Sequence, residues 1–261
     1  MIWRIRKYIQ HLFYLRHRKG HGIHSPYLFE FVNKIVFNSA ELTVPPEIIQ
    51  THRELRKDRT LIPEVKLGAA SHVNSTGERS VGSFVCHSSV PEKYGALLYR
   101  ISRWFEPEMI IELGSGLGIS TLYLASGSPH VSLHSIEGNP HRASFAEKVI
   151  AGTKLEMLSI HQGEMDEELD KLIPQMKSRF VAFLDGNHRY EPTIAYVRKL
   201  MKVAGDEALI IMDDIYWSKE MFKAWEELKS WPESRVSVDL YQMGIILLRR
   251  DLAKASFKFK F

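Results

Sequence analysis

From residue 109 onward, short apolar runs alternate with longer segments of helical periodicity. The runs predict strands at 109–113, 131–136, 155–160, 180–185 and 207–213. The early runs are almost unbroken, which is typical of parallel strands covered by helices on both faces. Strands at 235–242 and 244–249 are joined so tightly at Met243-Gly244 that they must be antiparallel. The pattern predicts an α/β fold with a doubly wound, seven-stranded, mostly parallel sheet.

The chain before this sheet has helical rather than strand periodicity. The first helix is predicted from apolar residues that recur at helical spacing: Ile2, Ile5, Ile9, Leu12 and Phe13. Its pattern stops at Lys19-Gly20. Ser25-Pro26 and Pro45-Pro46 begin two more predicted helices, which run to about residue 38 and about residue 59. We therefore expect an N-terminal helical extension over 1–62.

The segment 63–91 is rich in Gly and Ser and shows no sustained period. A long irregular segment beside a compact domain is typical of a lid or a substrate-binding loop, and disorder is the alternative. After Pro91 a helical apolar stripe returns, which we interpret as core packing. The sheet domain is accordingly expected over 92–261.

The positive charge of the chain is concentrated at its N-terminus. The whole sequence has 35 Lys and Arg against 31 Asp and Glu. Residues 1–24 hold six of the basic residues and no acidic one: Arg4, Arg6, Lys7, Arg16, Arg18 and Lys19. The remainder is close to neutral, so binding of nucleic acid by the main domain is not expected. The basic amphipathic helix fits docking on its own domain, a homodimer contact, or peripheral membrane contact.

Other features of the composition suggest a cytoplasmic protein. A single cysteine, Cys86, excludes an intramolecular disulfide and fits a reducing compartment. No apolar run is long enough for a transmembrane segment. A signal peptide needs an uninterrupted apolar region, and here Arg4, Arg6 and Lys7 interrupt the N-terminal apolar residues.

The most specific local pattern follows the first predicted strand of the sheet. Gly114, Gly116 and Gly118 connect the strand at 109–113 to a helix that begins near Ser120. Such a turn lets backbone approach a ligand and points free N–H groups at it. The spacing differs from the dinucleotide fingerprint G-x-G-x-x-G, whose third glycine would fall on Ile119.

A carboxylate stands at the end of the second strand of the sheet. Glu137 lies 23 residues beyond Gly114, where it can accept hydrogen bonds from both hydroxyls of a ribose. The next residues, Asn139-Pro140, form a good start for a helix. Ribose binding is our interpretation of Glu137, and a solvated surface charge is the alternative.

Acidic residues also follow the fourth and fifth strands, at Asp185, Asp213 and Asp214. Ligands of open α/β sheets bind beyond the carboxyl ends of the strands, and neighbouring strands bring these residues together. Three carboxylates in one small volume need a compensating cation, and oxygen ligands favour Mg²⁺, with Ca²⁺ or Mn²⁺ possible. The alternative without metal is that Asp214 caps the following helix and Asp185 closes a turn with Gly186.

Taken in order, these motifs resemble those of the class I S-adenosylmethionine (SAM) methyltransferases. The acidic residues and the Asp-Gly-Asn-His-Arg-Tyr segment at 185–190 resemble the cation-dependent, catechol-type O-methyltransferases and a related bacterial Asp-Gly-x-His-x-Tyr group, some members of which methylate sugars. The resemblance covers about 91–250 and implies a Rossmann-like methyltransferase fold. It implies a metal site at Asp185, Asp213 and Asp214, with Asp214 where the catechol enzyme has Asn.

The resemblance also implies roles for individual residues. His188 stands where the family has a lysine base, and Asp185 joins it as a catalytic residue. The residues implied for SAM are Glu112, Gly114, Ser115, Gly116, Gly118, Ser120, Glu137, Gly138, Gly163, Glu164 and Asp185. Gly163 and Glu164 follow the third strand, where the family contacts adenine. Trp217 is a candidate wall of the substrate site, with core packing as the alternative.

We therefore expect a cytoplasmic, SAM-dependent O-methyltransferase that uses Mg²⁺ to activate a hydroxyl of a small molecule, either a phenol or a sugar. Two alternatives remain open. One is a metal-independent RNA or protein methyltransferase that docks through the basic arm. The other is a SAM-binding protein without catalytic activity.

Overall fold

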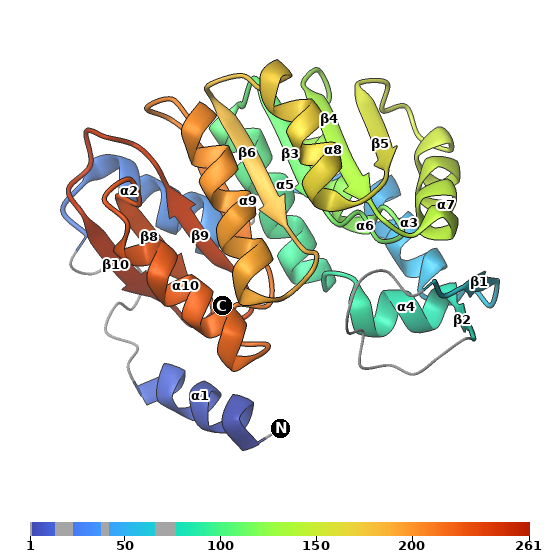
Figure 1. Ribbon diagram of the computed structural model, residues 1–261, viewed down its shortest axis with the longest axis horizontal. Coiled ribbons are helices and arrows are strands. Elements are labelled where there is room, and N and C mark those ends of the chain that lie inside the picture. Colours follow the sequence, from blue (N-terminus) through green and yellow to red (C-terminus); the bar gives the residue numbers. More distant parts are fainter. Residues whose placement is uncertain (1, 14–22, 38–41, 66–76) are drawn as a thin grey trace. The chain divides into compact units, whose positions relative to one another are not determined.

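The computed structural model describes residues 2–13, 23–37, 42–65 and 77–261 (Figure 1). The chain divides into two compact units. The first consists of the described parts of 1–41, Pro107–Ile111 and Leu172–Phe261, and the second of the described parts of Leu42–Glu106 with Glu112–Lys171. Strand β3 (Met109–Leu113) is shared between them, because the division falls after Ile111.

The predicted α/β sheet is present, with one strand more than expected. Among the described residues the large sheet has eight strands in the order β10-β8-β9-β7-β6-β3-β4-β5. The prediction of seven strands is wrong, because Ala255–Lys258 adds β10 in parallel to β8. The short sequence 255–258 mixes polar and apolar residues, and only its pairing with β8 makes it a strand. The hairpin of β8 and β9 is antiparallel, as predicted from Met243-Gly244.

The first unit contains the acidic end of the predicted sheet. Its strands are β6 (Phe180–Leu184), β7 (Leu209–Met212), β8 (Val236–Asp239), β9 (Gly244–Leu247) and β10. Its helices are α1 (Ile2–Phe13), α2 (Pro26–Glu30), the π-helix η1 (Phe31–Phe37), the 3₁₀ helix η2 (Ile173–Gln175), α9 (Tyr190–Val203) and α10 (Lys219–Ser230). Helices α9 and α10 lie side by side (Figure 1).

The second unit contains the glycine-rich turn. Its strands are β1 (Leu61–Pro63), β2 (Glu78–Ser80), β4 (Ser132–Glu137) and β5 (Leu158–Gln162). Its helices are α3 (Pro46–Leu55), α4 (Val81–Ser88), α5 (Glu92–Phe105), α6 (Ile119–Gly127), α7 (Pro140–Ala151) and α8 (Met165–Leu172), which ends at the boundary. Helix α5 packs on α6, as its predicted apolar stripe requires.

Burial explains why most of the central strands are largely apolar in sequence. Every residue of β3, β6, β7, β8 and β9 is buried. Strand β5, at one end of the order, is only partly covered and alternates more polar residues. Parallel pairing of β6 with β7 places the carboxyl ends of both strands at the same edge of the sheet, which is where the acidic residues follow.

The N-terminal helices form as predicted, with different ends. Helix α1 ends at Phe13 among the described residues. Ser25 caps α2 by accepting a hydrogen bond from the Leu28 N–H, and the helix continues as η1 to Phe37. Arg16, Arg18 and Lys19 of the basic arm lie outside the described residues. No helix in the described ranges is both long and apolar enough to cross a membrane.

Part of the segment at 63–91 is regular, contrary to prediction. Leu61–Pro63 and Glu78–Ser80 pair as antiparallel strands, and Val81–Ser88 forms α4 with Ser80 as its N-cap. Sequence periodicity misses this because the two strands are three residues each and depend on one another. Residues 66–76 of the predicted lid lie outside the described ranges.

A glycine on α5 provides a test of the packing in the second unit. A Cβ at Gly95 would lie 2.4 Å from the ring of Tyr123, whereas one at Gly152 would meet nothing closer than 3.4 Å. We expect Gly95→Ala to lower the free energy of unfolding by about 1–3 kcal/mol through overpacking, as measured by urea denaturation. Gly152→Ala is the control and should be near neutral. Equal stability of the two variants would contradict the packing of α5 on α6.

Candidate functional site

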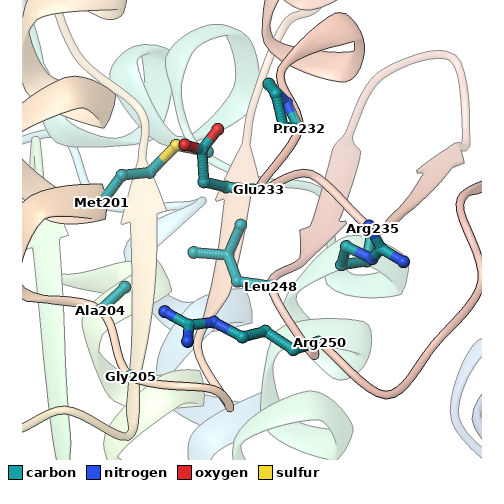
Figure 2. Close-up of a pocket in the computed structure, with 8 residues that line it drawn as sticks. All are labelled: Met201, Ala204, Gly205, Pro232, Glu233, Arg235, Leu248 and Arg250. Carbon is teal, nitrogen blue, oxygen red and sulfur yellow. The ribbon is translucent and has the colours of Figure 1, made fainter.

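One cavity of the first unit lies at the amino ends of the parallel strands, where α/β sheets do not usually bind ligands. Its volume is about 400 Å³, and its lining includes Gly205, Arg235 and Arg250 (Figure 2). The Gly205 N–H donates to the Ser178 carbonyl, just before β6 begins, so the cavity lies at the amino ends of the parallel strands. Ligands of open α/β sheets bind beyond the carboxyl ends. We therefore place the candidate site elsewhere.

The glycine turn of the second unit has the backbone that its sequence predicts. Gly114, Gly116 and Gly118 have φ angles of 103°, 54° and 85°, a region that side chains disfavour. A Cβ at Gly116 would also lie 3.0 Å from the ring of Phe84. The turn leads directly into α6 at Ile119, so the N–H groups of the first helical turn face the space beyond the strand.

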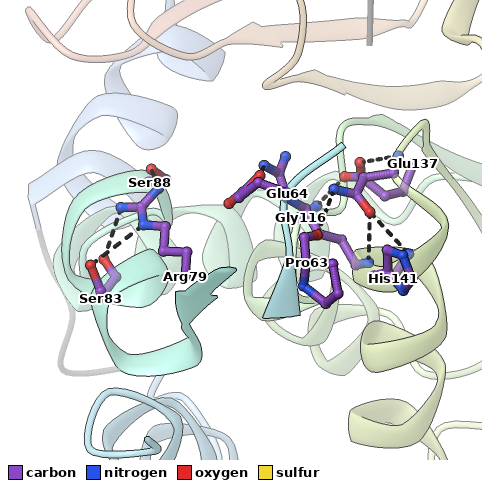
Figure 3. Close-up of polar contacts among 10 residues, drawn as sticks. Pro63, Glu64, Arg79, Ser83, Ser88, Gly116, Glu137 and His141 are labelled. Atoms are coloured by element: carbon purple, nitrogen blue, oxygen red, sulfur yellow. Dashed lines mark hydrogen bonds and ion pairs between the residues drawn. The ribbon is translucent and has the colours of Figure 1, made fainter. Parts of the chain in front are cut away.

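Glu137, at the end of β4, is hydrogen-bonded to this turn (Figure 3). Its Oε2 accepts from the Gly116 N–H at 2.8 Å, and its Oε1 accepts from the Asn139 N–H at 2.8 Å. The side chain is buried, and this burial raises the pKa of the carboxyl, while the two hydrogen bonds act in the opposite direction. The reading of Glu137 as a solvated surface charge is therefore wrong.

The remaining residues predicted for a nucleoside also gather at this end of β4 and β5. The Gly163 N–H donates to the Glu137 carbonyl, and Glu164 begins the turn into α8. Gly138 lies between Glu137 and the helix cap Asn139, whose Oδ1 accepts from the first N–H groups of α7. Gly116 and Gly163, which are distant in sequence, thus both donate hydrogen bonds to Glu137.

Ser115 and Glu112 have different surroundings. The Ser115 hydroxyl is buried and has no hydrogen-bond partner among the described residues, so it is available to a ligand. Glu112 is fully buried, and its Oε2 accepts from the hydroxyls of Thr121 and Ser135, both at 2.5 Å. Burial raises the pKa of Glu112, against hydrogen bonds that include one from Ser120. Glu112 ties β3 to β4 and α6, a structural task that the sequence did not reveal.

A group of residues that sequence reasoning missed borders the glycine turn. Arg142 forms an ion pair with Glu64, and the guanidinium groups of Arg79 and Arg142 lie 5.2 and 4.8 Å from the centre of the Phe84 ring. Figure 3 shows Arg79 with its hydrogen-bond partners Ser83 and Ser88. The Asn139 amide also donates to the Pro63 carbonyl at 3.4 Å. Residues from β1, β2 and α4 are therefore part of the wall around Gly116. Their separation in sequence left no local signal for this.

In the first unit, Asp185 and Asp213 follow the paired ends of β6 and β7. Leu184 and Met212 are partners in the sheet, and the Asp213 N–H donates to the Leu184 carbonyl at 2.9 Å. Burial, and then the charge of Asp214, raise the pKa of Asp213 well above its usual value. Its Oδ1 has no hydrogen-bond partner in the described part of the chain. A buried carboxylate oxygen without a partner is a costly feature unless a ligand satisfies it.

His188 and Asp214 complete this acidic cluster. His188 Nε2 lies 3.6 Å from Asp185 Oδ1, and burial lowers the pKa of His188 while Asp214 opposes the shift. Burial also raises the pKa of Asp214, against the charges of His188 and Arg4. Asp214 and Asn187 both have left-handed backbones, with φ angles of 54° and 51°. Such strain at non-glycine residues is concentrated at functional sites.

Two alternatives for this region are wrong. Ser218, not Asp214, caps α10, since its hydroxyl accepts from the Met221 N–H. Trp217 is not a core residue, because 49% of its surface is exposed, and Arg4 lies 4.4 Å above its ring. The carboxyl group of Asp214 therefore does not cap α10.

The cluster has the chemistry of a cation site without a complete set of ligands in place. Asp185 and Asp213 offer oxygen ligands, and the unsatisfied Oδ1 of Asp213 fits a hard cation. No group of three or more His, Cys, Asp or Glu within the described ranges is arranged to hold a metal ion. The carboxylate oxygens of Asp185 and Asp213 fit Mg²⁺ in chemical kind.

A second, smaller cavity follows this cluster along the chain. Its volume is about 260 Å³, and it is lined by Arg189, Tyr190, Glu191, Pro192, Glu220 and Lys223. The Lys223 ammonium lies 3.9 Å above the Tyr190 ring, and the Tyr190 hydroxyl donates to Glu227. Sequence reasoning did not identify this polar cavity.

The chain is similar to known methyltransferases. Residues 111–215 match a family described as "Methyltransferase domain", whereas no curated protein matches. An O-methyltransferase from Bacillus cereus, solved with S-adenosylhomocysteine (SAH), is 15% identical, with 85% of this chain and 97% of that chain covered and a TM-score of 0.58. An O-methyltransferase from Streptomyces achromogenes, involved in tomaymycin synthesis and solved with SAM, is 18% identical, with coverages of 82% and 95% and a TM-score of 0.56.

A methyltransferase from Podospora anserina, solved with SAH, is 13% identical, with 87% of this chain and 98% of that chain covered and a TM-score of 0.58. At these identities the structural likeness establishes the fold. Residues 111–215 are thus similar to a methyltransferase domain, and the α/β sheet has the fold of these methyltransferase structures.

The unsatisfied carboxylate gives a prediction that does not depend on the substrate. Asp213→Asn removes a buried charge and supplies an amide that can donate to Asp185. In buffer with EDTA we expect stability to rise by about 1 kcal/mol, the lower end of the cost of leaving a buried polar atom without a partner, as measured by thermal unfolding. The control is Asp206→Asn, at an exposed ion pair with Arg250, which should change little. A loss of stability in Asp213→Asn would contradict an uncompensated buried charge.

Proposed function

We propose that this chain transfers the methyl group of SAM to a hydroxyl of a small molecule, either a phenol or a sugar, with the assistance of Mg²⁺. The observation that supports SAM best is the buried Glu137 carboxylate bonded to the N–H of Gly116 inside the matched residues. A single, exposed cysteine, Cys86, fits a cytoplasmic setting for this activity.

The second unit supplies the groups that would hold SAM. Glu137 can accept hydrogen bonds from the two ribose hydroxyls while it keeps its bonds to backbone N–H groups, because a carboxylate has several acceptor positions. Ser115 offers a buried hydroxyl without a partner, and the glycine turn lets the ligand lie against the backbone. Bound SAM supplies an electrophilic methyl group. The protein contributes binding, alignment and the exclusion of water.

The first unit supplies the groups that would act on the acceptor. Burial keeps the His188 ring neutral near pH 7, so it can accept a proton. Asp185 lies beside Nε2 and favours a proton on that atom, which leaves Nδ1 as the basic atom. Asp185, Asp213 and Asp214 are the residues that would hold Mg²⁺. A bound Mg²⁺ ion lowers the pKa of a hydroxyl near it.

The function is tested by a methyl-transfer screen. Phenols, sugars and RNA are incubated with labelled SAM, with and without EDTA. We expect transfer to a phenol or a sugar, lost with EDTA and restored by Mg²⁺. Transfer to RNA alone, or transfer that EDTA does not affect, would contradict the proposal, and SAM binding without transfer to any acceptor class would favour a binding protein.

The donor site is tested separately by calorimetry. Glu137→Gln keeps the shape of the side chain but removes the charge that two ribose hydroxyls would meet. We expect SAM affinity to fall about 10- to 100-fold, the cost of losing hydrogen bonds to a charged group. The matched control is Glu156→Gln, at an exposed position, which should bind SAM normally. Undiminished affinity in Glu137→Gln would exclude Glu137 as the ribose ligand.

The proposed base gives a kinetic prediction. His188→Ala should lower kcat for an accepted substrate by about 10²- to 10⁴-fold, the usual contribution of general base catalysis, with SAM affinity intact. His130→Ala, at an exposed histidine, is the control and should retain normal kcat. If the two variants turn over equally fast, His188 is not the base.

A further inference from the structure

Helix α1 attaches to the first unit by the face that carries His11. This side chain is buried, with Nε2 3.0 Å from the Phe259 carbonyl oxygen and Nδ1 3.4 Å from Asp239 Oδ1. One turn earlier, the Lys7 ammonium lies 3.9 Å above the Phe222 ring. Trp3 meets the same ring edge to face at 5.9 Å. The spacing of four residues from Trp3 to Lys7 to His11 makes this a single stripe along the helix.

The apolar stripe of α1 is a different one, and it is exposed. Ile5, Ile9 and Phe13 are 54%, 46% and 84% exposed, and Leu12 beside them is 36% exposed. The helix lies on its own unit, which is one of the predicted alternatives, but these residues do not make that contact. The docking uses polar and aromatic residues instead. The four exposed apolar residues lie close together on a helix of 12 residues and form a contiguous apolar face. An exposed apolar face of this kind marks a contact surface.

The charge around this face is of one sign. Arg4 and Arg6 are exposed on α1, and the sequence has no Asp or Glu before Glu30. Pairing of α1 with α1 of a second copy would bring these arginines together without a carboxylate to compensate them. An anionic surface has the complementary charge. A helix with exposed Leu, Ile and Phe on one side and basic residues beside them is also the form that inserts at a lipid headgroup layer.

We propose that this face of α1 binds the surface of an anionic phospholipid bilayer. Ile5, Ile9, Leu12 and Phe13 enter the boundary between headgroups and acyl chains, and Arg6 lies at the level of the phosphates. His11 holds the opposite face on the protein, so the helix is presented in one orientation before it meets the bilayer. The helix lies in the interface and does not span it, because 12 residues cover about 18 Å and a bilayer core needs about 30 Å.

The test is cosedimentation of the full chain with two kinds of vesicle. One contains phosphatidylcholine and phosphatidylglycerol in equal parts, and the other phosphatidylcholine alone. We expect strong binding to the first kind, weak binding to the second, and release by salt. Ile9→Ser with Phe13→Ser should lower the partition coefficient by at least about tenfold, given the apolar area removed from the bilayer.

Matched controls separate this face from exposed apolar residues in general. Phe29→Ser with Met157→Ser changes side chains that are 51% and 52% exposed outside α1, and binding should be unchanged. Arg6→Gln should weaken binding to anionic vesicles about fivefold, the effect of one basic residue near the surface. Arg59→Gln, an exposed arginine of the second unit, should not weaken it.

Other partners of this face give other results. Sedimentation velocity without lipid shows whether Ile9→Ser with Phe13→Ser dissociates an oligomer, and a filter assay shows whether it abolishes binding to RNA. Equal binding of the paired α1 variant and the wild type to vesicles overturns the proposal, and so does loss of an oligomer or of RNA binding without any vesicle binding. Circular dichroism and thermal unfolding confirm that each variant is folded.

Discussion

The hydrogen bond from the Gly116 N–H to Glu137 is the interaction on which the donor half of this protein depends. It joins the turn after β3 to the end of β4 and holds a carboxylate where burial alone would disfavour its charge. The glycine is needed because its backbone is left-handed and because Phe84 leaves no room for a side chain. Backbone conformation, packing and ligand chemistry therefore impose the same residue at this position.

Two buried carboxylates of the first unit differ in how far their oxygens are hydrogen-bonded within the protein. Asp239 accepts from the Tyr216 hydroxyl at 2.8 Å and from the Tyr241 N–H at 2.9 Å, and it lies against His11. Asp213 is as deeply buried, yet one of its oxygens has no partner among the described residues. The first carboxylate is fully used in holding α1 and β8 in place. The second has capacity that only a ligand can use, which is why we assign it to the site.

The sequence predicted most of the fold because hydrophobic periodicity reports burial directly. Strands covered on both faces are largely apolar, and β3, β6 and β7 were located from that property. The sequence failed where an element depends on a distant partner. Strand β10 exists through its pairing with β8, and β1 exists through β2, so neither has a pattern of its own.

The candidate site was predicted to a similar degree, for a similar reason. A glycine turn and a carboxylate at a strand end are local signals, so Gly116 and Glu137 were found together. Phe84, in contrast, is an ordinary apolar residue until α4 places it against the turn.

The sequence by itself determined the class of fold, the turn that fits a nucleoside and the acidic residues at the strand ends, because each is written in a few neighbouring residues. The tertiary structure decided which polar groups are satisfied and which face of α1 is covered. The periodicity of α1 left open what its apolar stripe contacts, and in the structure His11 docks the helix while Ile9 stays exposed. A helical pattern shows that two faces differ. The partner that each face meets depends on the residues packed against it.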